Sequence, residues 1–442
     1  MISARASLSR LIVCSAVACL LSALPGPGPF VRARSAAPIG AQPAPPDVDA
    51  AAFRGQGHLA FVWAGALYVL DGARVTLRRI TPLGQASKFL WSPSGRWLAY
   101  DTGGGQLWLT GADGTSTHRV MGLPGPVASY TWLTAADVLV ISLDGASPTP
   151  GLWTTTPSGQ AHKAASAPSF GLPSPDGRAL AYTVTLPFGR HPETRSDALY
   201  TVATAGGRPV LRYLGRQEGV WLIGWWPNGK GLLFWKDPFH SESFAADGLG
   251  LYTVPLGGTP RLITTALTEG LAVSPSGRTL LIMSGLGREL WHNKALTLCT
   301  IETAVCQALP RPPGFVLLDP AWSPRGDRIA YVRAHDRGSA VGAFGFTTNR
   351  ALLAWVRTHT LWAADAKGRH AREIVAAGTG IYRPQWSADD RHVLYIRDNA
   401  LWLIDTGGGA PARVVGPFPG TPDLFGFYGS PYLPLTYAWN RR

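Results

Sequence analysis

Short apolar segments recur along the whole chain, each after a turn motif and before a second apolar segment. A clear copy has the turn Ser-Pro-Ser-Gly at 92–95, the triplet Leu-Ala-Tyr at 98–100 and the pair Leu-Trp at 107–108. Pro fixes φ at the first central turn position, and Gly supplies the positive φ that closes a tight turn. Short apolar runs bounded by Gly and Pro are typical of strands. The repeated unit is therefore predicted to be strands joined by tight hairpins.

This unit repeats to the end of the chain. The apolar triplet occurs at 59–61, 98–100, 139–141, 180–182, 232–234, 280–282, 329–331 and 393–395. The Leu-aromatic pair occurs at 67–68, 107–108, 152–153, 199–200, 251–252, 361–362 and 401–402, with a degenerate copy at 296–298. Aligned turn positions at 91, 132, 173, 225, 273, 322 and 386 are 41 to 64 residues apart. Periods of this size made of short strands indicate an all-β fold, a β-propeller.

The repeats predict eight four-stranded blades, with seven as the alternative because the copies at 132 and 273 are weak. The first unit begins at His58 with the triplet and has no innermost strand. A strand-like segment at 424–431 follows the last unit and ends in Ser-Pro, as innermost strands do. We expect this C-terminal segment to complete the first blade and close the ring, which would remove exposed sheet edges.

The pattern Ser-Pro-Asp-Gly-Arg-x-Leu-Ala-Tyr at 174–182, followed by Leu-Tyr at 199–200, resembles the repeat of the TolB-like propeller family. The resemblance covers about residues 57–431 and implies the propeller fold. Similar repeats occur in the Tol-Pal periplasmic protein, in prolyl-oligopeptidase-type peptidases and in other exported proteins, so the resemblance does not imply one activity. We expect neither the separate N-terminal domain of the Tol protein nor the hydrolase domain of the peptidases.

The N-terminal region has the pattern of an export signal. Residues 1–10 carry two arginines and no acid, and 11–24 form an apolar run that is short of the roughly 20 residues needed to span a membrane. We expect a signal peptide at 1–36, a Pro/Ala-rich flexible tether at 37–56 and one propeller domain at 57–442. The alternatives are an uncleaved anchor or lipidation at Cys19, which the apolar residues after it disfavour. The expected location is extracytoplasmic: periplasmic, secreted or at the cell surface.

Cysteines and charge add to this interpretation. Cys299 and Cys306 are the two cysteines outside the signal, and an exported protein usually pairs them as a disulfide. Two buried thiols are the alternative, since Cys-x6-Cys is not a zinc spacing. The formal net charge is +13, and four arginines in 1–36 leave +9 for the rest. This charge favours an envelope protein or an anionic polymer or glycan as partner, although dispersed surface charge would give the same total. We expect no nucleic acid, no transmembrane segment after the signal, and a monomer.

No catalytic or cofactor motif stands out. Gly-x-Ser-x-Gly, His-Glu-x-x-His and an EF-hand loop do not occur. The phosphate-loop-like string at 224–230 is followed by Gly231 rather than Ser or Thr, and it coincides with a repeat turn. We therefore expect no cofactor, no metal and no catalytic residue.

Insertions between the second and third strands are long in four successive repeats, at 186–197, 236–250, 284–294 and 333–358. Loops at this junction share one face of a propeller, and long loops in compact folds are usually functional. The predicted binding face contains His191, Arg195, His240, Trp291, His292, His335, Arg350 and Trp355. Trp291 and Trp355 are the expected anchors for a partner, with packing of the loops onto the ring as the alternative. Metal ligation by the histidines is a second alternative, against scattered solvated side chains.

These observations predict an exported, non-catalytic binding module of the cell envelope. The alternatives are a propeller enzyme, a hydrolase or lyase that uses the loop-lined face, and a sensor domain at the cell surface.

Overall fold

The computed structural model describes residues 44–86, 88–102, 105–133, 137–143, 151–165, 171–186, 195–204, 207–338, 349–378, 380–420, 423–425, 430–432 and 436–441. Strands dominate these residues, and two helices, α1 (Glu242–Asp247) and α3 (Asn349–Val356), lie in the long insertions. The all-β prediction is confirmed.

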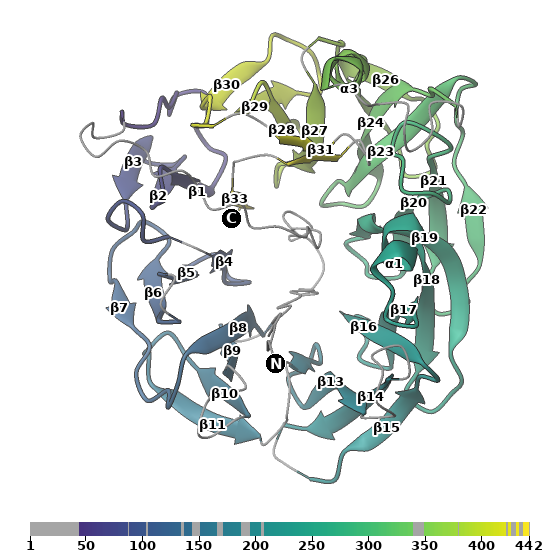
Figure 1. The fold of residues 1–442 in the computed structure, drawn as a ribbon. Helices are drawn as coiled ribbons and strands as arrows, with labels where there is room; N and C mark the ends of the chain where they lie inside the picture. Colours follow the sequence, from purple (N-terminus) through teal and green to yellow (C-terminus); the bar gives the residue numbers. More distant parts are fainter. Residues whose placement is uncertain are drawn as a thin grey trace, which may run out of the picture.

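Antiparallel sheets are arranged around a central axis, each with one edge near the axis and the other at the rim (Figure 1). From the axis outward, three sheets are β4 (Phe89–Trp91), β5 (Trp97–Asp101), β6 (Leu107–Gly111) and β7 (His118–Arg119); β8 (Val127–Trp132), β9 (Leu139–Leu143), β10 (Leu152–Thr155) and β11 (Ala161–Ala165); and β12 (Gly171–Pro173), β13 (Ala179–Leu186), β14 (Ser196–Ala203) and β15 (Val210–Leu214). This radial arrangement of sheets is a β-propeller.

The next sheet has seven strands: β16 (Glu218–Trp225), β17 (Gly231–Pro238), β18 (Leu249–Pro255), β19 (Arg261–Val273), β20 (Thr279–Ser284), β21 (Ala295–Thr300) and β22 (Cys306–Ala308). The long β19 pairs with β18 through its first half and with β20 through its second half. Two further sheets are β23 (Phe315–Trp322), β24 (Arg328–His335), β25 (Thr360–Asp365) and β26 (Arg372–Val375); and β27 (Ile381–Trp386), β28 (His392–Arg397), β29 (Ala400–Asp405) and β30 (Ala412–Val415).

The repeated apolar triplets and Leu-aromatic pairs form the two middle strands of the sheets, as predicted. Their aromatic residues face each other across neighbouring strands, for example Phe61 and Tyr68, whose ring centroids are 5.7 Å apart. Tyr182 and Tyr200 stack in the same way at 5.8 Å. Such cross-strand aromatic pairs stabilise a sheet by roughly 0.2–1 kcal/mol each. The positions of the triplet and the Leu-aromatic pair therefore reflect the register in which the two middle strands pair.

The serine of the turn motif has a structural role that the sequence pattern left open. The Ser174 hydroxyl accepts a hydrogen bond from the Ala179 backbone N–H at 2.9 Å, and Gly177 donates to the Ser174 carbonyl. Gly177 has φ 71°, in the region that favours glycine. Ser92 makes the same bond to the backbone N–H of Trp97. The motif thus closes the hairpin by one backbone and one side-chain hydrogen bond.

Tryptophans at the ends of the innermost strands tie neighbouring sheets together. The Trp132 indole donates to the Leu90 carbonyl at 3.0 Å, and Trp322 donates to the Ala272 carbonyl at 3.2 Å. Trp91 donates to the carbonyl of Ala438, near the C-terminus. Each bond crosses from one sheet to the preceding one, so these tryptophans fix how the sheets are packed around the axis.

The first and last parts of the chain share one sheet, which contains β3 (Thr76–Arg79), β2 (Ala66–Asp71), β1 (His58–Trp63) and β33 (Tyr437–Asn440). The expectation that 424–431 pairs with β1 is wrong. In that segment β31 (Asp423–Phe425) pairs with β32 (Ser430–Tyr432), whereas β33 pairs with β1. The physical reason is that Trp439 and Asn440 stand where other innermost strands have Trp and Ser, and the Asn440 amide donates to the Gly95 carbonyl.

The expected tether is also wrong for residues 44–56, which pack on the propeller. Val48 bridges to Val415 of β30, and Asp49 donates its backbone N–H to the Val414 carbonyl. Phe53 is fully buried and packs against Trp439. This segment therefore covers the junction between the last sheet and the sheet of β1, and its apolar residues outweigh the Pro/Ala-rich composition.

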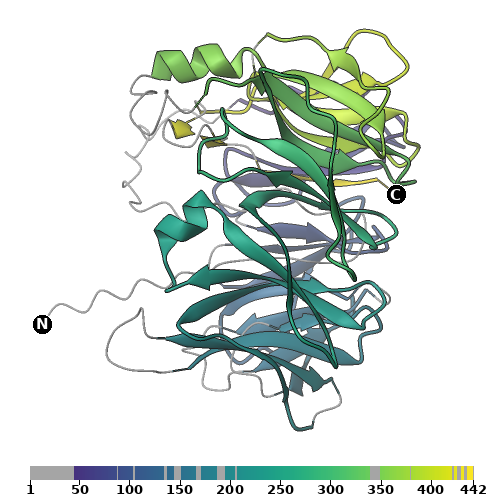
Figure 2. The same cartoon turned by 90° about the vertical axis from the view of Figure 1, so that its right-hand side faces the viewer.

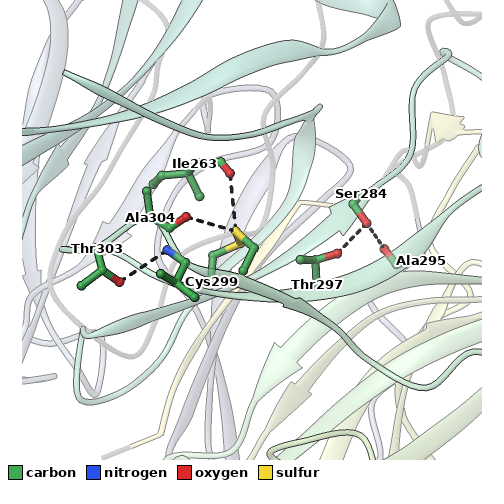
Figure 3. The surroundings of a disulfide bond; sticks show 9 residues. Ile263, Ser284, Ala295, Thr297, Cys299, Thr303 and Ala304 are labelled. Atoms are coloured by element: carbon green, nitrogen blue, oxygen red, sulfur yellow. Dashed lines mark hydrogen bonds between the residues drawn. A yellow bond between two sulfur atoms is a disulfide. The ribbon is translucent and has the colours of Figure 1, made fainter.

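The predicted disulfide is present. Cys299 of β21 is bonded to Cys306 of β22, and the Cys306 Sγ lies 3.5 Å from the Ile263 carbonyl oxygen (Figure 3). The two cysteines are direct partners in the strand register, so the bond fastens the outermost hairpin of its sheet.

Candidate binding face

The insertions with described structure lie at one end of the propeller. Successive strands of a sheet run in opposite directions, so the connections between second and third strands all emerge on one side. Figure 2 shows α1 and α3 on this same side of the ring. We call it the helix-bearing face; it comprises the insertions at 195, 236–250, 285–294, 333–338 and 349–358 and the link between two sheets at 215–218.

The first described part of this face is the turn before α1. Phe239 and His240 both have left-handed backbone, with φ 57° and 50°. The Phe239 N–H donates to the Gln217 carbonyl at 2.8 Å, and the His240 ring Nε2 lies 3.2 Å from the Arg195 carbonyl oxygen. The side chain of Ser241 then caps α1 by accepting from the Phe244 N–H. The turn is thus held against both the link that follows the preceding sheet and the insertion of that sheet.

The loop at 285–294 is held by an ion pair to α1 and by hydrogen bonds within the loop. The Arg288 guanidinium pairs with both carboxylate oxygens of Asp247, with Nη2–Oδ2 at 2.6 Å. The Lys294 ammonium is fully buried and donates to the carbonyls of Leu286, Gly287 and His292. Burial lowers the Lys294 pKa to about 8. This buried cation therefore organises the loop from inside instead of facing a ligand.

The same loop is joined to the next insertion by His292 and Asp336. The His292 ring Nδ1 is 2.9 Å from a carboxylate oxygen of Asp336, and Arg311 approaches the other oxygen at 3.7 Å. Burial opposes ionisation of Asp336, but its hydrogen bonds from His292 and the backbone outweigh burial and lower its pKa. The insertions consequently form one connected surface across adjacent sheets.

The two tryptophans expected as anchors are buried. Trp291 is 1% exposed and Trp355 is 2% exposed, and their rings meet edge to face at 6.4 Å. The Trp355 indole donates to the His335 carbonyl at 2.8 Å. The expectation that they contact a partner is therefore wrong, because the 349–356 helix folds onto the ring and uses Trp355 as its core residue.

The predicted histidines are spread along the face. His240 and His292 have the contacts above, His335 is exposed with its ring against Phe315, and His191 lies outside the described residues. Within the described ranges, no three His, Cys, Asp or Glu side chains form a group that could hold a metal ion. Arg195 and Arg350 are exposed on this face.

Large apolar side chains are exposed on the helix-bearing face. Phe239 is 51% exposed, Phe244 50%, Leu286 63% and Leu353 44%. Leu286 and Leu353 were not among the residues predicted for the binding face. The sequence signal for Leu353 was its place in α3: Leu352, Trp355 and Val356 are buried, so Leu353 falls on the outer side.

A second group of charged residues lies on the innermost strands. Glu269, Asp319 and Arg383 sit at register shifts of β19, β23 and β27. The Arg383 N–H donates to an Asp319 carboxylate oxygen at 2.9 Å. Glu269 is exposed, whereas Asp319 is half-buried; loss of solvent raises the pKa of Asp319, and the backbone hydrogen bond and the charge of Arg383 partly oppose this. The bulges thus gather two carboxyl groups and one guanidinium along neighbouring inner strands.

Across the described ranges, no helix is long and apolar enough to cross a membrane. No protein-family model matches this chain, and no curated protein matches its sequence.

Solved structures share its fold at low identity. A eukaryotic initiation factor is 12% identical over 88% of this chain and 99% of that one, with TM-score 0.50. A prolyl endopeptidase is 10% identical over 76% of this chain, with TM-score 0.48, and this chain spans 50% of its length. A putative TolB from Agrobacterium tumefaciens is 15% identical over 75% of this chain and 94% of that one, with TM-score 0.35. At these identities the likenesses concern the fold alone, and the assignment of this chain to the β-propellers rests on its radial sheet topology.

Proposed function

We propose that the ring has eight four-stranded blades and is closed by β33. The seven-stranded sheet counts as two blades that share the long β19, because each half of β19 has its own partner. The pairing of β33 with β1 supports closure, since it brings the two chain ends into one blade. The proposal also includes export, with residues 1–36 as the signal. The Cys299–Cys306 bond supports export, because disulfides persist in oxidising compartments.

We propose that this propeller is a non-catalytic binding module of the cell envelope and that it binds an envelope protein through the helix-bearing face. The observation that carries the proposal is that the insertions on this face are held in fixed positions by side-chain contacts and yet expose large apolar side chains. The Arg288–Asp247 ion pair, the contact between His292 and Asp336 and the buried Lys294 hold the insertions in place. The side chains of Phe239, Phe244, Leu286 and Leu353 remain exposed to solvent. Interface cores are enriched in such side chains, on surfaces that move little on binding.

The opposite end of the ring supports the same assignment. There the hairpin turns are short and bond to one another, as where the Ser94 hydroxyl donates to Asp137 at 2.6 Å. Arg325 pairs with the buried Asp390 at 3.1 Å. Polar groups at that end form hydrogen bonds and ion pairs between neighbouring blades. The helix-bearing face is therefore the better surface for a partner.

The test is binding of the purified mature protein to envelopes from cells of its source that lack the gene. We expect saturable binding that protease treatment of the envelopes abolishes. Arg350→Ser/Leu353→Ser should weaken binding about ten-fold, the loss of roughly 1.4 kcal/mol. The control is Val305→Ser, which removes an exposed apolar side chain at the opposite end. Equal binding of both variants, or binding that survives protease, would contradict the proposal; the latter would indicate a polymer.

An enzyme is the second candidate, and the observation that favours it is the pair of carboxyl groups on neighbouring inner strands, Glu269 and the half-buried Asp319, whose pKa is raised by loss of solvent. Perturbed carboxyl groups are a mark of acid-base sites, although structural ion-pair networks produce them too. Under the main proposal, Glu269→Gln/Asp319→Asn should leave envelope binding unchanged. Loss of binding in this variant, with the fold intact, would favour the enzyme.

A further inference from the structure

We infer that the helix-bearing face binds an acidic protein segment with large apolar side chains, and that Phe239, Phe244 and Leu286 form its docking patch. This inference rests on the proposed function and adds the chemistry of the partner.

Phe239 is the first indication. Its φ of 57° lies in the left-handed region, where a bulky residue is strained and Gly or Asn is preferred. The hydrogen bond that Phe239 itself makes in this turn is a backbone one, from its N–H to the Gln217 carbonyl, and glycine would keep it. The ring itself is half exposed. The exposed half of the Phe239 ring is therefore available for contact with a partner.

Phe244 and Leu286 extend the patch across the boundary to the next repeat. On α1, Ala245 points inward and is buried, while Phe244 is exposed. The loop that carries Leu286 lies along this helix, because Gly287 donates to the Asp247 carbonyl at 3.0 Å and Arg288 donates to the Ser243 carbonyl. The three apolar side chains thus stand on two segments that are fixed to each other.

The charge around the patch indicates an acidic partner. Exposed Arg195 and Arg216 lie beside the turn of Phe239, next to the carbonyls and links that hold it. Arg288 is paired with Asp247 and adds no net charge. On α3 the same combination recurs, since exposed Leu353 lies between exposed Arg350 and Arg357. Spacings of three and four residues place these three side chains on one side of the helix.

A protein segment fits this surface better than the other possible occupants. An anionic polymer would satisfy the arginines but would leave the phenylalanines and leucines in water. A second copy of the mature protein would bring its own positive charge, +9 without residues 1–36, against the same arginines. Acidic residues interspersed with large apolar ones satisfy both features at once.

The experiment selects binders from a library of random displayed peptides of about 16 residues on the mature protein. We expect enriched peptides to be net negative and to contain at least two large apolar residues. Their binding should weaken with added salt, because exposed charges are screened. Phe239→Gly/Phe244→Ser should weaken it at least ten-fold, whereas the matched exposed substitution Val305→Ser should not. Thermal melting checks the fold, and Phe239→Gly should not lower the melting temperature because it relieves strain.

Each other result overturns the inference in a way that separates it from the proposed function. Peptides that depend on the two phenylalanines but are neutral or basic would refute the acidic partner and leave the face as a binding surface. Peptides indifferent to both phenylalanines, or no enrichment at all, would refute the patch. Envelope binding of Arg350→Ser/Leu353→Ser decides the proposed function independently of these outcomes.

Discussion

Leu353 and Trp355 are two residues apart on α3 and face opposite ways. Trp355 packs on Trp291 and on the ring of His359, at 4.5 Å between ring centroids, while Leu353 is exposed. The sequence of 349–356 indicated a helix with an apolar side, but not which side would meet the ring. That choice depends on Trp291 and His359 from other segments, so the role of each aromatic could not be predicted locally.

This difference predicts unequal effects of substitution. Trp355→Ala should lower the free energy of unfolding by about 3–5 kcal/mol, because it empties a buried site and removes the hydrogen bond to the His335 carbonyl. Leu353→Ala should change it by less than about 0.5 kcal/mol. Urea unfolding of both variants measures this. Equal losses would contradict the assignment of Trp355 to the core.

His359 predicts an acid sensitivity of the fold. Burial lowers its pKa to about 4, and among the described atoms its Nε2 has no hydrogen-bond partner. The unfolded chain binds this proton near pH 6.5, so between pH 6.5 and 4 the unfolded state holds more protons and stability falls as pH falls. The loss is about 1.4 kcal/mol per pH unit, or about 2 kcal/mol from pH 6.5 to 5. Urea unfolding at both pH values should show a smaller drop in His359→Gln; identical drops would contradict neutral burial.

At the scale of elements, the distinctive feature is the contact between the N-terminal and C-terminal segments of the described chain. β33 supplies the innermost strand beside β1, and residues 47–49 add hydrogen bonds to the outermost β30. The sequence pattern predicted a closing strand near the C-terminus, and the Ser-Pro that ends 424–431 indicated that segment instead of 437–440. The better signal was Ala-Trp-Asn at 438–440, which matches Ala-Trp-Ser at 321–323. Asn440 stands where most other copies have serine, so residues 438–440 do not match the Ser-Pro turn motif.

Removal of residues 436–442 should therefore prevent stable folding. It would expose the edge of β1 and remove the Ala438 carbonyl that accepts the Trp91 indole hydrogen bond. We expect a large loss of soluble protein and a lower melting temperature by circular dichroism. Removal of Arg441 and Arg442 alone is the control and should be tolerated. A shorter chain that melts like the full one would contradict closure by β33.

At the scale of the whole molecule, the strand order and the position of the insertions followed from the sequence, because each repeat has the same hydrophobic pattern. What the sequence could not provide was contact between repeats. The Arg288–Asp247 and His292–Asp336 pairs join residues of different insertions that are 41 and 44 positions apart in the sequence. The group of Glu269, Asp319 and Arg383 likewise arises from bulges on three separate strands. Local patterns contain no information on these distances.

The central claim is that the helix-bearing face contacts a protein partner, and site-specific photo-crosslinking in the cells that produce the protein tests it most directly. A photoreactive amino acid at Leu286 or Leu353 replaces an exposed side chain on this face, and one at Val305 replaces an exposed side chain at the opposite end. The account predicts that Leu286 and Leu353 crosslink to the same partner and that Val305 does not. Equal yields at all three positions, or no adduct at Leu286 and Leu353, would contradict it.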